Sequence, residues 1–389
     1  MGFQTRPNTG YPEGRTVFGY IRNYYEHTPT TRQIQLPLAI IRAEFADGNS
    51  ILNLMDASDY RQQLDIYTGT LTTKYDLFGE TTIKAFAHQT IPNLFVMKIN
   101  RNNTKDGKEI VMKIDCEPSE EQNNDLRWKM QEPMQLNFEL SDDQQTVSIT
   151  SKTNMTTTQW QVSTNNKIEI ADNKIVIPLL AGDNEVRFMI SREDCPAIEE
   201  LKNMEYQALL KSHEKEWSDI WQTSWVDFPD ATANKIWTRT KYHGISHFSV
   251  IPEKPLIPTG LSANIWGFTY PQDVCYMAEN IPRLGHLDRA EKALQYWLDV
   301  LPQAQAYARR TLGVEGGYYP WNPPFEDWEK YERHGVVSEH SYQLHNPAYV
   351  LAMVWHYYHI TQDKEMLNKY LPIIEEVFRY YSNISMLGA

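Results

Sequence analysis

Val186-Arg187-Phe188-Met189-Ile190 closes the first half of the chain with a short strand-like run. From Tyr206 the apolar spacing changes to a period of about 3.6 residues, the period of a helix. One stripe at this spacing is formed by Tyr206, Leu209, Leu210, His213, Trp217, Ile220 and Trp221. The change between residues 190 and 206 therefore predicts a β domain followed by a helical domain.

Alternation at every second position recurs toward the N-terminus. Short runs of this kind lie at 95–99, 110–114, 136–140, 146–149, 167–170 and 174–177. Polar turn residues separate them, including Asp142-Asp143 and Gly182-Asp183. Many short strands at such spacing are typical of an antiparallel sandwich. We expect a β-sandwich domain over residues 1–195.

Helical periodicity continues to the C-terminus. It predicts a helical linker over 196–228 and a helical domain over 229–389, with helices at about 231–247, 285–310, 347–360 and 363–383. Two loops, 252–271 and 313–347, are longer than the usual helix connection of about 2–8 residues. Binding and catalytic residues concentrate on such loops, so we expect the functional site there.

Composition excludes several classes of protein. The net charge of −13 disfavours DNA or RNA as a partner. No run of about 18 apolar residues is present that could span a bilayer. Three cysteines, Cys116, Cys195 and Cys275, have no CxxC spacing, which argues against a disulfide framework or a zinc site. The start at Met1 has no signal segment, which fits a cytoplasmic protein or a mature periplasmic or secreted one.

Aromatic residues are abundant: 12% of the chain, with 11 Trp and 23 Tyr. Flat amphipathic rings suit the apolar C–H faces of sugars, although they also fill ordinary protein cores. Composition alone leaves both interpretations open.

Four stretches together resemble glycoside hydrolase family 65, which includes maltose, trehalose and kojibiose phosphorylases and related α-glucosidases. They are 60–72, the linker helix from Tyr206, 260–273, and Gly316-Gly317-Tyr318-Tyr319-Pro320-Trp321 with the helix that follows from His345 to Asp363. The resemblance covers about 35–385. It implies an α+β multidomain chain: an antiparallel β-super-sandwich, a helical linker and the N-terminal part of an (α/α)6 barrel. It implies a carbohydrate substrate, with inorganic phosphate as an alternative to water as the acceptor, no cofactor and no membrane partner. A homodimer is one of the states that the resemblance leaves open.

Departures from the family pattern affect the expected sugar. Gln272 stands where the family has Trp before its Asp, and Cys275 where Glu follows. Gln343 replaces a Glu found in many members. The sugar recognised need not be α-glucose, and helical-barrel families that act on rhamnosides or fucosides stay open.

The resemblance assigns substrate binding first to Asp273, whose counterpart grips the non-reducing sugar. Gln272, Trp266 and Tyr270 lie in the same aromatic loop. A carboxylate can accept hydrogen bonds from two sugar hydroxyls, and charged acceptors form the stronger bonds. The alternative is that Asp273 is only a helix N-cap.

Trp321, with Tyr319 and His345, completes the expected sugar pocket. Pro320 restricts Tyr319 to extended geometry and so directs the loop. Trp321 could equally be a buried packing residue, and His345 a core histidine. We expect Asp273, Trp321 and His345 to converge on one concave face.

Inverting cleavage of a glycosidic bond needs a general acid, together with a carboxylate base about 6.5–9.5 Å away or a bound phosphate. The resemblance places the acid in a G-P-[DN]-E-Y motif after the helix at 363–383, and no such motif occurs before Ala389. Catalytic residues are therefore expected beyond Ala389, with Glu339 as the internal alternative. Either the chain is part of a longer inverting glycosidase or phosphorylase, or it is a non-catalytic sugar-binding or scaffold protein.

A metal site is the remaining alternative for the loop that contains His334, Glu339 and His340. Histidine and carboxylate side chains are common metal ligands. Their spacing here matches no HExxH or helical i, i+4 pair, so we expect no metal.

Overall fold

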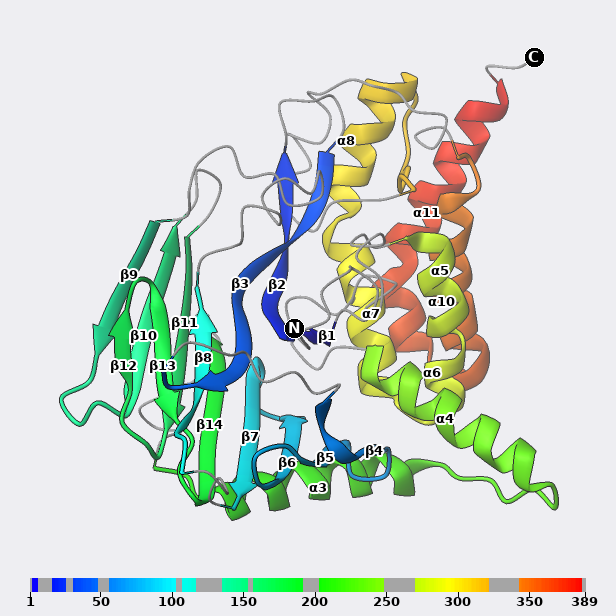
Figure 1. Cartoon of the computed structure of the whole chain (residues 1–389). Helices are drawn as coiled ribbons and strands as arrows, with labels where there is room; N and C mark the ends of the chain where they lie inside the picture. The colour runs from blue at the N-terminus through cyan, green and yellow to red at the C-terminus, as the bar shows by residue number, and fades with distance from the viewer. Residues whose placement is uncertain are drawn as a thin grey trace. The chain divides into compact units, whose positions relative to one another are not determined.

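The computed structural model describes the chain in segments. These are residues 2–5, 16–25, 31–47, 56–102, 107–116, 135–152, 157–191, 203–247, 270–321 and 343–386, with the backbone alone before residue 39. The chain divides into two compact units, one of Met1–Tyr20 and Gln35–Asp219, the other of Ile21–Ile34 and Ile220–Ala389 (Figure 1). The predicted domain bounds at 195 and 228 stay predictions, because compactness alone does not define a unit that folds independently.

Two antiparallel sheets form the β part. The six-stranded sheet has the order β1-β2-β3-β8-β13-β12, and the eight-stranded sheet the order β4-β5-β6-β7-β14-β11-β10-β9. The first contains β1 (Gly2–Thr5), β2 (Thr16–Tyr25), β3 (Thr31–Phe45), β8 (Ile110–Asp115), β12 (Glu169–Ala171) and β13 (Lys174–Pro178). The second contains β4 (Ser58–Asp65), β5 (Thr70–Asp76), β6 (Glu80–Ala87), β7 (Leu94–Arg101), β9 (Gln135–Leu140), β10 (Thr146–Lys152), β11 (Thr157–Thr164) and β14 (Gly182–Ser191).

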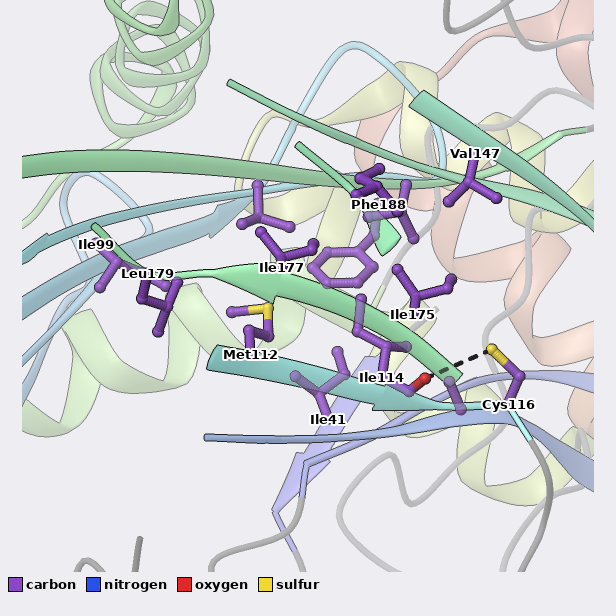
Figure 2. Close-up of a cluster of buried hydrophobic side chains, with 14 of the residues drawn as sticks. Ile41, Ile99, Met112, Ile114, Cys116, Val147, Ile175, Ile177, Leu179 and Phe188 are labelled. Atoms are coloured by element: carbon purple, nitrogen blue, oxygen red, sulfur yellow. Dashed lines mark hydrogen bonds between the residues drawn. The ribbon is translucent and has the colours of Figure 1, made fainter. Parts of the chain in front are cut away.

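One hydrophobic core joins the inner faces of the two sheets (Figure 2). Ile114 and Ile177 come from the six-stranded sheet, and Val147 and Phe188 from the eight-stranded sheet; all four are completely buried. Truncating a core side chain of this kind typically costs about 2–5 kcal/mol, since a cavity remains. The sandwich predicted from alternating apolar residues is therefore present.

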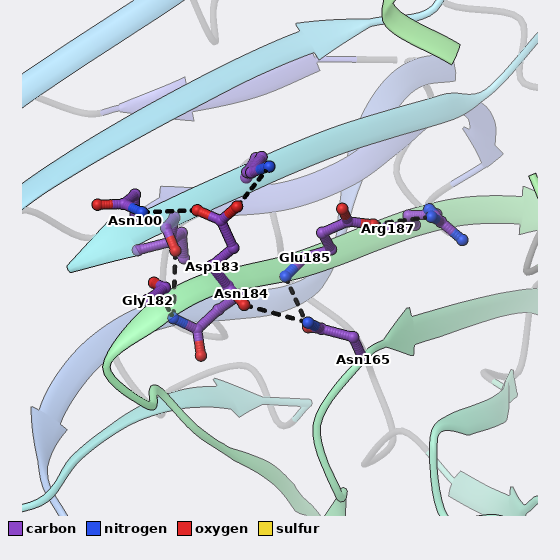
Figure 3. A network of polar contacts seen from close by, with 9 residues as sticks. Asn100, Asn165, Gly182, Asp183, Asn184, Glu185 and Arg187 are labelled. Atoms are coloured by element: carbon purple, nitrogen blue, oxygen red, sulfur yellow. Dashed lines mark hydrogen bonds and ion pairs between the residues drawn. The ribbon is translucent and has the colours of Figure 1, made fainter. Parts of the chain in front are cut away.

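A buried amide holds the start of β14 in place (Figure 3). Asn184 is fully buried, and its Nδ2 donates to the carbonyl oxygens of Ile99, Leu180 and Gly182 at 3.1, 2.8 and 3.2 Å. Its Oδ1 accepts from Leu180 N and from Asn166 Nδ2, both at 2.7 Å. All of these bonds satisfy main-chain groups or another amide, so the cost of burying Asn184 is offset.

Helix α3 (Tyr206–Thr223) packs closely over Gly69, which accounts for a glycine at this position of the stretch 60–72. Gly69 has φ +62, and a Cβ at this position would lie 2.1 Å from Nε1 of Trp217. Only a residue without a side chain allows Trp217 to pack over the turn between β4 and β5. The apolar side chains of α3 from Tyr206 to Trp217 therefore pack this helix against the sandwich.

The described helices after α3 are α4 (Ala231–His247), α5 (Pro271–Ala278), α6 (Asn280–Arg283), α7 (Leu287–Asp299), α8 (Leu301–Leu312), α10 (Asn346–Thr361) and α11 (Lys364–Met386). One expectation is wrong: the single helix at 285–310 is two helices. Val300 separates them, and Pro302 in the first turn of α8 has no N–H to continue the hydrogen bonding of α7. A closed (α/α)6 barrel stays a prediction. None of the described helices is both long and apolar enough to cross a membrane.

Candidate functional site

Asp273 lies in the first turn of α5, which begins at Pro271 after the N-cap residue Tyr270. The alternative that Asp273 is itself the N-cap does not hold, because Tyr270 occupies that position. A carboxylate in the first turn interacts favourably with the positive end of the helix dipole. The Asp273 side chain is exposed, but neighbouring protein atoms remove part of its hydration, and this desolvation raises its pKa.

Tyr270 joins Asp273 to Trp321. The Tyr270 and Trp321 rings have centroids 4.7 Å apart and are tilted by 53°. Tyr270 is buried, and its pKa is raised chiefly by that burial, with a further contribution from the nearby charge of Asp273. Trp321 is half-buried. Asp273 and Trp321 are therefore both neighbours of Tyr270, which places them in the same cluster.

His345 is connected to helix α5 through the side chains of two tyrosines. Tyr276 in α5 and Tyr349 in α10 have ring centroids 6.0 Å apart, and Tyr349 meets the His345 ring edge-on at 5.7 Å. The pKa of Tyr349 is raised first by its hydrogen bond with Tyr276, and the charge of Asp273 contributes as well. His345 is exposed, at the N-cap of α10, and makes no side-chain cap. It is therefore not a core histidine.

The structure adds Tyr276 and Tyr349 to the residues expected from the sequence. Tyr276 follows Asp273 by one helical turn, and Tyr349 follows His345 by one turn. Side chains at i, i+3 or i, i+4 share one helical face, so this spacing was the available signal. It could not be used before α5 itself was known to be a helix.

Tyr318 and Tyr319 support Trp321 from within the helical unit. Both are fully buried. The hydroxyl of Tyr319 donates to the carbonyl oxygen of Trp297 at 2.9 Å, and that of Tyr318 to Gln343 at 3.4 Å. Tyr319 thus positions the segment that carries Trp321 and does not reach solvent.

Two of the three departures from the family pattern, Gln272 and Cys275, lie close to Asp273 in α5. Gln272 is half-buried beside it in α5. Cys275 is buried, and this burial, with the charge of Glu279, raises the pKa of its thiol to about 11. A thiol with so high a pKa is protonated near neutral pH and is not a nucleophile.

Four expected residues, Trp266, His334, Glu339 and His340, lie outside the described residues. Within the described segments, no group of three or more His, Cys, Asp and Glu side chains is arranged to hold a metal ion.

The cluster of Asp273, Trp321, Tyr276, Tyr349 and His345 combines a charged acceptor with exposed or half-exposed rings. Helices α5 and α10, which carry most of it, lie side by side (Figure 1). A carboxylate accepts hydroxyl protons, while aromatic faces pack on C–H groups. These are the two chemistries needed to hold a sugar.

Two known proteins that are similar to this chain are described as kojibiose phosphorylases. A kojibiose phosphorylase from Halothermothrix orenii is 24% identical over an alignment of 196 positions, and the match covers 46% of this chain and 24% of that enzyme. A solved structure from the human microbiome, assigned as a kojibiose phosphorylase, matches with a TM-score of 0.68 over 95% of this chain, at 14% identity. The resemblance to glycoside hydrolase family 65, which was predicted from the sequence, is confirmed as a similarity to kojibiose phosphorylases.

The likeness to the solved kojibiose phosphorylase concerns the fold. This chain spans 53% of that structure. A family GH92 α-mannosidase from Bacteroides thetaiotaomicron also matches, but its TM-score of 0.39 and 10% identity are too low to indicate a shared fold. No protein-family model matches the chain.

Proposed function

We propose that this chain belongs to a carbohydrate-active enzyme and supplies its sugar-holding face. The observation that carries the proposal is the cluster around Asp273, in which an exposed carboxylate lies near Trp321, Tyr349 and His345. Asp273 would accept hydrogen bonds from sugar hydroxyls, and Trp321 would pack against the apolar face of the ring. Tyr319 and Pro320 act through Trp321, as positioning residues.

The reaction proposed for the whole protein is cleavage of an α-linked glycosidic bond with inversion, by water or by phosphate. The likeness to kojibiose phosphorylases supports a glycoside as substrate. Inversion requires an acid and either a base or a phosphate positioned on opposite sides of the bond. We assign none of these roles to a described residue, and Asp273 acts only in binding.

The second candidate is a sugar-binding or scaffold protein without catalysis. The observation that favours it is that Asp273 is the one carboxylate among the five residues of the cluster. Inverting cleavage needs two groups, a general acid together with either a base or a phosphate. Both candidates require sugar binding, and only the first requires turnover.

Calorimetric titration of the 389-residue chain with glucose, maltose, kojibiose and trehalose tests the shared step. Asp273→Asn should weaken binding of the preferred sugar at least tenfold, since a charge-assisted hydrogen bond contributes about 1.5–3 kcal/mol. The matched control is Asp288→Asn, which removes an exposed carboxylate from the first turn of another helix, α7. Equal loss in both variants, or no binding of any sugar, would contradict the proposal.

Turnover separates the two candidates. Release of glucose or glucose 1-phosphate is measured with each disaccharide, with and without inorganic phosphate. Activity that is lost in Glu339→Gln would place the acid inside this chain. Binding without turnover in the complete protein would favour the sugar-binding candidate.

A further inference from the structure

A cavity of about 470 Å³ lies within the sandwich unit, far along the chain from the Asp273 cluster. Its lining comes from the ends of β10 and β11, from β14, from Lys98 in β7 and from residues 203–207 at the start of α3. A volume in this range is typical of small-ligand sites. Nothing in the proposed function uses this cavity.

Buried polar side chains form part of the cavity wall. Thr146, Ser163 and Thr164 are each at least nine-tenths buried, and the Thr146 hydroxyl donates to Oγ of Ser163 at 3.3 Å. Asn165 is held by its own hydrogen bonds, in which Oδ1 accepts from Glu185 N at 2.8 Å and Nδ2 donates to the Asp183 carbonyl oxygen at 3.1 Å (Figure 3). These bonds fix the polar groups in place before any ligand arrives, which lowers the cost of binding.

Each of the two cations of the cavity is paired with a carboxylate. Arg187 Nη2 lies 3.0 Å from Glu185 Oε2 and donates to the carbonyl oxygen of Met204, also at 3.0 Å. Lys98 pairs with Asp183 at 2.7 Å. Both cations thus already have carboxylate partners, and Asp143 and Glu205 add further negative charge to the lining. Such a site disfavours an anion, and the described residues form no group suited to a metal ion.

Tyr206 supplies an unsatisfied group in the same wall. It is 4% exposed, and its hydroxyl has no hydrogen-bond partner among the described residues. Burial, with the charge of Glu185 as the next cause, raises its pKa to about 12, so the hydroxyl keeps its proton and can donate. A buried polar group without a partner costs about 1–3 kcal/mol, and a ligand or water that reaches it removes this cost.

We propose that this cavity is a second saccharide-binding site, separate from the cluster around Asp273. Its neutral amide and hydroxyl groups match a ligand that is rich in hydroxyls and carries no charge. The choice of a saccharide among such ligands rests on the proposed function, but binding in this cavity does not depend on Asp273. The Tyr206 hydroxyl and the rim amides of Gln145 and Gln207 are the groups that the sugar would engage.

The test is ligand-observed saturation-transfer NMR on the 389-residue chain with glucose and maltose, with inorganic phosphate as an anionic comparison. All measurements are made in the Asp273→Asn background, in which binding at the first site is expected to be at least tenfold weaker. Gln145→Ala/Gln207→Ala should weaken sugar binding at least tenfold. The matched control is Gln303→Ala, which removes an exposed helical amide from α8, outside the cavity.

Tyr206→Phe provides the second variant. If the hydroxyl meets the sugar, binding should weaken at least threefold while the melting temperature stays equal or rises, because the free protein loses only an unpartnered group. Sugar binding that is unchanged in both cavity variants would overturn the proposal, as would binding of phosphate alone. Loss of all sugar binding in Asp273→Asn would also overturn the proposal of a second site, while the proposal of a site at Asp273 would stand. Binding that is abolished only by the cavity variants would instead count against the proposed function.

Discussion

The backbone of Tyr380 in α11 lies directly against Gly316. A Cβ on Gly316 would be 2.2 Å from the Tyr380 nitrogen and 2.7 Å from the carbonyl oxygen of Glu376. The next residue, Gly317, donates its N–H to that same Glu376 oxygen at 2.8 Å. The two glycines thus allow the segment that leads to Trp321 to cross α11 at backbone distance, which no larger residue permits.

Gly316→Ala should therefore destabilise the chain by about 3 kcal/mol or more, through the backbone clash and the strained φ of +120 together. Gly313→Ala is the matched control: its φ is +67 but nothing lies within 4 Å of the added Cβ, so the cost should be about 1 kcal/mol. Urea unfolding measures both. Equal losses would mean that the close approach to Tyr380 is unimportant.

Lys241→Met should destabilise the helical unit. Nζ of Lys241 is buried and donates to the carbonyl oxygens of Ile220 and Ser224 at 2.9 and 2.6 Å, just where α3 ends. Desolvation lowers the pKa of Lys241 to about 8, but its bonds compensate the last carbonyls of the helix. We expect a loss of about 2 kcal/mol, measured by thermal unfolding. Lys235→Met, at an exposed position of α4, the helix that also carries Lys241, should change stability little.

Acid should destabilise the sandwich unit through His88 and His213. Burial lowers the pKa of each to about 4, and the His213 ring stacks on Phe86 at 4.6 Å. In the unfolded chain the pKa is near 6.5, so below that value the unfolded state binds protons that the folded state rejects. Stability is then complete above about pH 6.5 and falls as the pH drops toward 4.

The predicted loss is on the order of 2 kcal/mol per histidine across this interval. Urea unfolding at pH 7.0 and 4.5 measures it. His213→Leu should reduce the pH dependence, whereas His359→Gln, at an exposed position, should leave it unchanged. A stability that is flat with pH would contradict the neutral, buried state of both histidines.

Sugar binding at the first site should weaken on acidification earlier than for an ordinary aspartate. Partial desolvation raises the pKa of Asp273, so its charge is lost at a higher pH than usual. The neutral acid is a poorer hydrogen-bond acceptor than the carboxylate. Titration calorimetry with the preferred sugar should therefore show affinity falling as the pH passes down through this raised pKa. In Asp273→Asn the affinity should be low and independent of pH over the same range.

Residue spacing alone was enough to predict the sandwich and most of the helices. Alternating apolar residues such as Ile175 and Ile177 face the core, and the stripe from Tyr206 packs as a helix, because side-chain periodicity follows directly from backbone geometry. Spacing could not separate α7 from α8, since one Pro302 among good helix formers ends the hydrogen-bond ladder without changing the apolar pattern.

What the sequence determined by itself was local: the types of its elements, and the Gly-Gly-Tyr-Tyr-Pro-Trp segment as a place of constraint. Tertiary structure alone decided which residues meet. Tyr349 of α10 lies beside Tyr276 of α5, and Gly316 lies against Tyr380 of α11. In both cases tertiary packing brings together residues that are distant in the sequence. Periodicity encodes which face of an element is buried but not its partner, since the partner depends on packing between faces that many sequences could supply.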